Sequence, residues 1–194
     1  VFIKCLVGLF EPDEGDVKYD GTSFTKMNHD ERKVLRQQIG MLFQGSALFD
    51  SLTVQQNVLF PLDMFTDWTH AKKVKRVNEV LDRVNLHDVN NKFPAEISGG
   101  MKKRVGIARA IVLNPKYLFC DEPNSGLDPK TSILIDNLIS EITKEYEITT
   151  VINTHDMNSV IEIGDSIAFI YKGKIWWKGN NEEILNTTNQ EIND

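Results

Sequence analysis

Two adjacent acids, Asp121 and Glu122, follow a short apolar run, residues 117–120, whose length is typical of a buried strand. In an open α/β sheet, ligands bind beyond the carboxyl ends of such strands. An aspartate there can hold Mg²⁺, directly or through water. The neighbouring glutamate points the other way along the strand and could position or deprotonate an attacking water. The alternative is that two surface acids simply end a strand.

A second candidate site is Ser98-Gly99-Gly100, which opens a predicted helix. The Ser98 hydroxyl can accept a free N–H of the first helical turn. Gly99 and Gly100 have no Cβ, so an anion can approach their N–H groups closely. Because a helix N-terminus carries roughly half a positive charge, this tripeptide predicts a phosphate clamp. A capped helix without a ligand is the alternative.

Three elements must position these residues. The helix that begins after Ser98 ends at Asn114-Pro115, because proline cannot continue it. The strand at residues 117–120 comes next, and a tight turn at residues 125–129 follows the two acids. Each of these pieces has a physical reason to contact nucleotide phosphate.

Residues 97–129 read ISGGMKKRVGIARAIVLNPKYLFCDEPNSGLDP and resemble the nucleotide-binding subunits of ABC transporters. Residues 97–101 look like the LSGGQ signature, and residues 117–122 look like the Walker B strand with its catalytic glutamate. Residues 125–128 look like the D-loop, which brings Asp128 to the nucleotide. The resemblance implies a P-loop NTPase-like α/β core that binds ATP and Mg²⁺.

The same resemblance implies a head-to-tail dimer with two ATP molecules between its subunits. Ser98, Gly99 and Gly100 of one subunit then face the γ-phosphate that the other subunit holds. Met101 departs from the usual glutamine of the signature. We do not expect this to abolish phosphate binding, because Ser-Gly-Gly supplies the hydroxyl and the N–H groups.

Two further polar residues follow predicted strands. Gln44 comes after residues 39–43 and resembles the Q-loop glutamine, which contacts Mg²⁺ or the attacking water. His155 comes after residues 148–153 and resembles the H-loop histidine, which contacts the γ-phosphate and the catalytic glutamate. Without the resemblance, a lone glutamine is uninformative and a histidine after a strand is more often structural.

The phosphate-binding motif G-x-x-x-x-G-K-[ST] occurs nowhere in the sequence. Its lysine and backbone N–H groups normally cradle the β- and γ-phosphates. We interpret the chain as an N-terminally truncated ABC ATPase core that lacks the N-terminal strands and the P-loop. We therefore expect residues 1–194 alone neither to bind ATP tightly nor to hydrolyse it. The alternative is a degenerate pseudo-ATPase, which predicts decay at the other motifs.

The 194 residues suit one domain, residues 1–194, with a helical subdomain at about residues 45–95. A net charge of −6 gives no footprint for nucleic acid. The densest basic run, Lys102-Lys103-Arg104, is predicted to form a solvated helix face. Two cysteines indicate no disulfide framework. No apolar run approaches the ~20 residues that span a bilayer, so other chains must form any transport path.

An apolar segment, residues 45–65, follows Gln44 and reads GSALFDSLTVQQNVLFPLDMF. Most of its side chains are expected to form the core of the helical subdomain. The rest should form a groove that grips a transmembrane permease, which would place the protein at the cytoplasmic face of the inner membrane. Leu48 and Phe49 are the candidates for this contact.

Within the superfamily, residues 42–62, ISGGM and DEPNSGLDP look most like the ATPase of Mla-type systems. Those systems move phospholipids in the bacterial envelope with a permease and an MCE-domain substrate-binding protein. An importer or exporter ATPase for another substrate is the alternative. A soluble ABC ATPase of translation or DNA repair, and an interaction-only subunit that does not use ATP, are two further classes.

Overall fold

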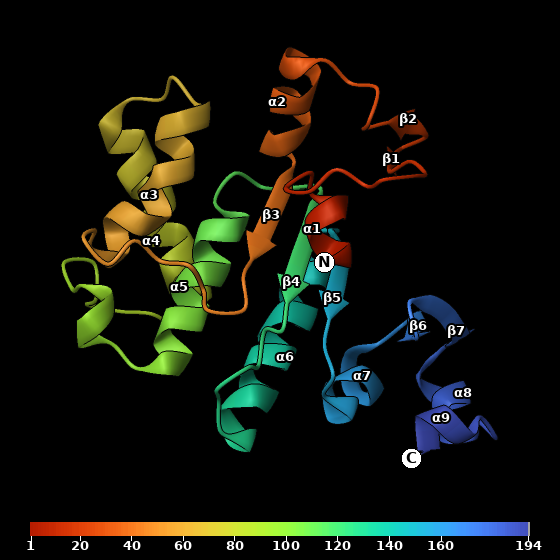
Figure 1. The fold of residues 1–194 in the computed structure, drawn as a ribbon. Coiled ribbons are helices and arrows are strands. Elements are labelled where there is room, and N and C mark those ends of the chain that lie inside the picture. Colours follow the sequence, from red (N-terminus) through yellow and green to blue (C-terminus); the bar gives the residue numbers. More distant parts are fainter. Residues whose placement is uncertain (194) are drawn as a thin grey trace.

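The computed structural model describes residues 1–193, so Asp194, the last residue of the predicted domain, lies outside the described residues. Its centre is a parallel sheet of three strands in the order β3 (Ile39–Leu42), β4 (Tyr117–Asp121) and β5 (Thr149–Asn153). Cys120 pairs with Leu42 on one side and with Ile152 on the other. All three strands therefore end at the same edge, as the arrows of Figure 1 show. The mixed α/β architecture agrees with the prediction from sequence.

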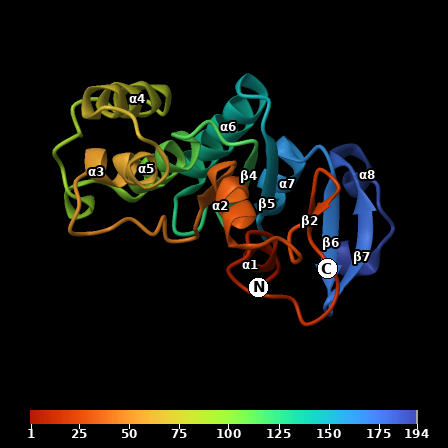
Figure 2. The same ribbon diagram turned by 90° about the horizontal axis from the view of Figure 1, so that it is seen from above.

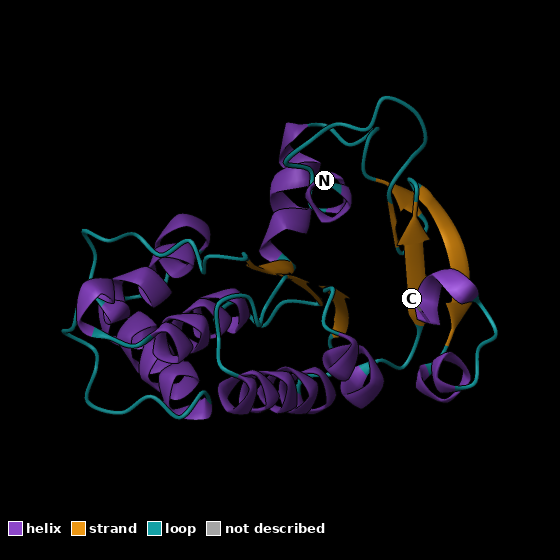
Figure 3. Cartoon of the chain, turned by 60° about the horizontal axis from the view of Figure 1, so that its bottom comes forward, coloured by secondary structure: helices purple, strands orange, loops and turns teal. Residues whose placement is uncertain are grey.

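Helices cover both faces of this sheet (Figure 3), because the strands alternate apolar side chains between two cores. Phe119 packs with α1 (Phe2–Leu6) and α2 (His29–Gln37) in one core. Leu118 and Cys120 point to the opposite face, where α5 (Gly99–Ile111) and α6 (Pro129–Glu145) complete the larger core. The acids at the end of β4 are thus held by a strand that is packed on both sides.

α5 lies very close to β3. A Cβ built on Gly40 would lie 2.4 Å from the carbonyl oxygen of Ala110, so only glycine permits this distance between strand and helix. A Cβ built on Gly106 would lie 2.8 Å from Leu42 Cδ1. The signature helix is therefore fixed against the strand that leads to Gln44.

The helices α3 (Val54–Phe65) and α4 (His70–Arg83) pack beside α5, at the opposite end of the molecule from β6 and β7 (Figure 2). Thr53 caps α3, and Gln56 completes a capping box with it. Pro61 lies inside this helix, which runs on to Phe65. A short 3₁₀ helix, η1 (Pro94–Glu96), leads into the signature.

The remaining elements lie at the chain ends. The strands β1 (Lys18–Tyr19) and β2 (Thr22–Ser23) form a hairpin after α1. After β5 come α7 (Met157–Ile163), the hairpin β6 (Ile167–Tyr171) and β7 (Lys174–Gly179), α8 (Asn181–Leu185) and α9 (Gln190–Asn193). Within residues 1–193 no helix combines the length and the apolar character needed to cross a membrane.

Candidate functional site

Glu122 and His155 meet at the carboxyl edge of the sheet. His155 Nδ1 lies 2.8 Å from Glu122 Oε2, and the hydrogen bond to this carboxylate raises the pKa of the imidazole. The Glu122 side chain is 19% exposed and that of His155 is 84% exposed, so the pair is open to a ligand on the histidine side. A carboxylate that is oriented by a histidine can accept a proton from a water molecule.

Asp121 ends β4 beside this pair. Asn153, its register partner on β5, donates a hydrogen bond of 2.8 Å from Nδ2 to Asp121 Oδ1. This contact fixes the rotamer of the aspartate and leaves its second carboxylate oxygen for another ligand. Asn153 was not predicted from the sequence, although its position at the end of the strand that precedes His155 indicates the same sheet edge.

The backbone of Glu122 is strained. Its φ of +49° is in the left-handed region, which costs a non-glycine residue about 1–3 kcal/mol. The surrounding chain fixes it: Glu122 N–H donates to the carbonyl of Asn153, and the Glu122 carbonyl accepts from the N–H of Ser125. The strain aims the glutamate side chain toward His155 at the sheet edge.

Gln44 reaches the same edge from β3. Its Nε2 donates to Ser125 Oγ at 3.3 Å, which leaves its carbonyl oxygen for another partner. Carboxylate and amide oxygens are ligands that Mg²⁺ accepts, and the ion usually takes one or two protein ligands together with substrate phosphates. The oxygens of Asp121 and Gln44 fit this requirement. Within residues 1–193 no cluster of three His, Cys, Asp or Glu side chains offers an all-protein metal site.

The predicted phosphate clamp stands at the N-terminus of α5. Ser98 is the N-cap, and its Oγ accepts from the N–H of Met101 at 3.3 Å. Ser98 and Gly99 are exposed, whereas Gly100 is packed so that a Cβ there would lie 2.8 Å from Thr131 Cγ2. The free N–H groups of this helix end therefore face outward, where an anion from outside the chain can reach them.

Asp128 caps α6 next to this clamp. Its carboxylate accepts from the N–H of Thr131 at 3.1 Å and from the Thr131 hydroxyl at 2.5 Å, and the hydroxyl bond lowers the pKa of the acid. Asp128 thus has a structural role that the sequence prediction did not include. Among the described residues, no hydrogen bond or ion pair joins Ser98 or Asp128 to Glu122 or His155.

The prediction of a solvated face for Lys102-Lys103-Arg104 is wrong for the middle residue, Lys103. Lys103 is only 4% exposed, and its Nζ donates to the carbonyl of Gln44 and, at 3.2 Å, to the carbonyl of Glu122. A positional signal existed: Lys103 precedes Gly106 and Ala110 by helical spacing, so it shares their buried face.

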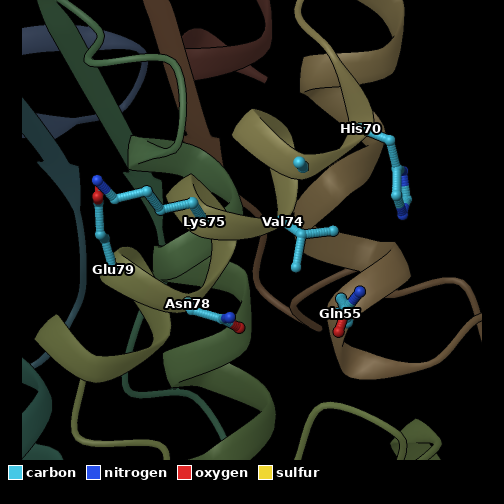
Figure 4. A pocket seen from close by; sticks show the side chains of 7 residues that line it. Gln55, His70, Val74, Lys75, Asn78 and Glu79 are labelled. Atoms are coloured by element: carbon cyan, nitrogen blue, oxygen red, sulfur yellow. The ribbon is translucent and has the colours of Figure 1, made fainter.

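A hollow of about 680 Å³ lies elsewhere, between α3 and α4 (Figure 4). Gln55 of α3 lines it together with His70, Val74, Lys75, Asn78 and Glu79 of α4. None of the residues predicted to bind nucleotide contributes to it. The candidate site is therefore an open edge and not this hollow.

Known proteins are similar to this chain in sequence and in fold. The family described as ABC transporter matches residues 1–125. The methionine import ATP-binding protein MetN of Carboxydothermus hydrogenoformans is 45% identical over 91% of this chain and 52% of its own length. The probable ribonucleotide transport ATP-binding protein mkl of Mycobacterium leprae is 38% identical over 95% of this chain and 53% of its own length. The chain thus spans about half the length of these curated relatives.

Solved structures agree. A dimeric ATP-binding cassette in a post-hydrolysis state, bound to ADP and Pi, matches with a TM-score of 0.83 and 30% identity over 93% of this chain and 79% of that one. The chain therefore belongs to the ABC transporter family, and the predicted ABC ATPase fold is confirmed. The names of these relatives concern methionine import and ribonucleotide transport and do not support the phospholipid prediction.

Proposed function

We propose that this chain, as a member of the ABC transporter family, is the ATP-hydrolysing part of a transporter and couples hydrolysis to a partner permease. One observation carries the proposal: Glu122 is paired with His155 beside Asp121, at the edge where three parallel strands end. Attack of water on a phosphoryl group needs a general base, a group that holds this base, and an oxygen ligand for a cation.

The residues take separate roles in this proposal. Glu122 orients and deprotonates the attacking water, and His155 holds that carboxylate and contacts the γ-phosphate. Asp121 and Gln44 provide oxygens toward Mg²⁺, which neutralises phosphate charge when it is bound. The cradle for the β- and γ-phosphates is absent from the 194 residues. Activity therefore requires a phosphate-binding loop in addition to the residues named here.

The exposed clamp at Ser98 and Gly99 favours a dimer. These residues make no hydrogen bond to Glu122 or His155 in their own chain, so an ATP that they contact is better held by a second subunit. The similar cassette of known structure is dimeric and carries ADP and Pi. In the dimer, Asp128 lies next to the clamp and to the bound nucleotide.

A small polar solute suits the relatives better than a phospholipid does. Two of them are named for methionine import and for ribonucleotide transport. We therefore propose uptake of a polar metabolite, which falls within the alternative stated from the sequence, an importer or exporter ATPase for another substrate. With the phospholipid substrate, the reason to expect an MCE-domain partner also falls away. The membrane partner is a permease, and the ATPase lies against its cytoplasmic face.

An exposed aromatic patch gives that permease a contact. Phe49, Phe60 and Met64 are 44%, 38% and 56% exposed, and the rings of Phe49 and Phe60 lie 4.9 Å apart. Buried Asn57 bonds to both the N–H and the carbonyl of Phe49 and fixes it there. The helical subdomain, proposed at about residues 45–95, would carry this docking surface.

Copurification with the permease tests this coupling. We expect Phe49→Asp to abolish copurification, because a charge buried against the partner would be unpaired. Leu48 is a poorer site for the test because it packs against the core cluster. Leu185→Asp is the control, since Leu185 is 64% exposed on α8, at the other end of the molecule (Figure 2). Full copurification of a folded Phe49→Asp variant would place the dock elsewhere.

Phosphate release tests the enzymatic part. A preparation that joins this chain to a phosphate-binding loop should release phosphate from ATP only with Mg²⁺, and residues 1–194 alone should release none. Transport of labelled methionine, of a nucleotide or of a phospholipid by vesicles with the permease then distinguishes the substrates. Absence of turnover with every motif present would favour an interaction-only subunit.

A further inference from the structure

One buried cation joins the two loops that carry Gln44 and Glu122. Lys103 stands on α5, four residues after the helix begins, and its ammonium group donates to the carbonyls of both residues. The glutamine loop, residues 44–47, follows β3, and the β4–α6 loop, residues 122–128, follows β4. A single side chain of the signature helix therefore fixes the distance between these loops.

A lysine is a costly choice at this position. Burial lowers the pKa of its ammonium group, because a charge without water is disfavoured. Packing alone would be served by methionine, which has a similar length and no charge. The lysine supplies two hydrogen bonds from a charged donor, which are stronger than neutral ones. We infer that the role of a lysine at this position is to donate hydrogen bonds to the two carbonyls.

The carbonyl of Glu122 belongs to a strained residue. Its left-handed conformation persists only where the surroundings fix it. Three bonds do so: its N–H donates to Asn153, and its carbonyl accepts from Ser125 and from Lys103. Lys103 is the one of these partners that lies on the helix of the phosphate clamp. Loss of its bond removes one of the three hydrogen bonds that hold the backbone of Glu122.

Arg109 shows what a merely structural cation does on the same helix. It donates to the carbonyls of Ser46 and Ala47 at 2.6 and 2.8 Å, and burial lowers the pKa of its guanidinium group. Both of these loop residues have positive φ, so they too need fixing. Arg109 holds the glutamine loop but has no hydrogen bond to Glu122.

We propose that Lys103 is a positioning residue for ATP hydrolysis: by clamping the carbonyls of Gln44 and Glu122 it links the phosphate-clamp helix to the catalytic edge. This inference rests on the proposed role of Glu122. Misplacement of a reacting group by about 1 Å can cost ~10²-fold in rate. We therefore expect Lys103→Met to lower kcat by ~10- to 100-fold while the KM for ATP stays within about twofold.

The test compares Lys103→Met, Lys103→Arg and Arg109→Met in a preparation that carries a phosphate-binding loop and hydrolyses ATP. Lys103→Arg keeps charged donors and should recover part of kcat. Arg109→Met, which removes bonds to the glutamine loop but none to Glu122, should lower kcat less than Lys103→Met does, even where its melting temperature falls. If Lys103→Met does not fold, Lys103→Gln, which removes the charge and shortens the side chain, takes its place and should also lower kcat.

Amide NMR spectra of residues 1–194 give a readout that needs no turnover. Lys103→Met should shift the amide resonances of both Gly45 and Glu122. Arg109→Met should shift only the amide resonances of the glutamine loop. Unchanged Glu122 resonances, or a normal kcat in Lys103→Met, would overturn the inference. A Glu122→Gln variant run in parallel separates the two proposals: if it retains turnover, the proposed function fails, and if it alone loses turnover, only the role of Lys103 fails.

Discussion

The β4–α6 loop begins with one carboxylate and is hydrogen-bonded to another, and the two differ in their exposure to solvent. Glu122 begins the loop, lies at the open edge and is paired with the exposed His155. Asp136, on α6, is 2% exposed and accepts from Asn124 Nδ2 at 2.8 Å and from Ser159 Oγ at 2.7 Å. The same chemical group therefore lies at an open edge in one place and closes a buried network in the other.

The buried network holds the loop in position. Asn124 belongs to the loop, Asp136 to α6 and Ser159 to α7, and Asn124 also donates to Ser159 at 3.0 Å. Burial raises the pKa of Asp136, although the bonds from Ser159 and Asn124 oppose this. One oxygen of Asp136 and the oxygen of Asn124 are buried without a partner. The acid proposed to be reactive thus lies at the open edge, whereas the fully buried acid supports the loop.

The largest effect on activity is expected at Glu122. Glu122→Gln should lower ATP turnover by ~10²–10⁴-fold, because the general base is lost. Stability should change by less than about 1 kcal/mol, since the partner His155 is exposed. Phosphate release and a melting curve on the same variant measure both. Near-normal turnover would move the role of base to another residue, with His155 the first to examine.

The buried acid should show the reverse pattern. Asp136→Ala leaves the donors of Asn124 and Ser159 buried and unsatisfied, which costs roughly 1–3 kcal/mol for each. Urea denaturation measures this loss. Asp136→Asn, which keeps the size and one acceptor, is the matched control and should lose less. Equal stability of Asp136→Ala and the parent would mean that the network does not support the loop.

The pH dependence of stability sharpens the same contrast. The pKa of Asp136 is raised on folding above its ordinary value of 3.8, so the folded state binds the proton more tightly. Stability from this group is therefore lost as the pH rises from 3.8 through the folded pKa. We expect the parent to lose stability relative to Asp136→Asn as the pH rises from 3.8 through the folded-state pKa of this carboxyl. A constant difference across that range would contradict the raised pKa.

The smallest effect is expected at His155. The bond to Glu122 raises its pKa above 6.5, so the proton stabilises the folded state below pH 6.5, and this is lost as the pH rises through the folded pKa. NMR titration of residues 1–194 should show the pKa of His155 falling toward 6.5 in Glu122→Gln. The signals of His29, His70 and His87 should not move with that substitution. No change at His155 would mean that the pair does not form in solution.

Much of the site could be predicted because its residues follow strands. Asp121, Glu122 and His155 end neighbouring strands, and parallel pairing then brings them together. The burial of Lys103 could not be predicted from charge, since its acceptors lie 59 and 19 residues away in the chain.

The transported solute was not predictable for a different reason. The residues at the sheet edge are proposed to contact phosphate and a cation, so their types carry no information about a transported solute. A resemblance among short motifs therefore suggested a phospholipid system, whereas similarity over most of the chain is to proteins named for methionine import and ribonucleotide transport.

We propose above all that Glu122 of one copy catalyses hydrolysis of an ATP whose γ-phosphate is contacted by Ser98 of a second copy. Light scattering of Glu122→Gln, in a preparation with a phosphate-binding loop, tests it directly. ATP should convert this variant to a stable dimer, because nucleotide binds but is not turned over. Adding Ser98→Arg, an exposed change at the start of α5, should return it to a monomer without unfolding it. A monomer at saturating ATP, or a dimer that ignores Ser98→Arg, would contradict the claim.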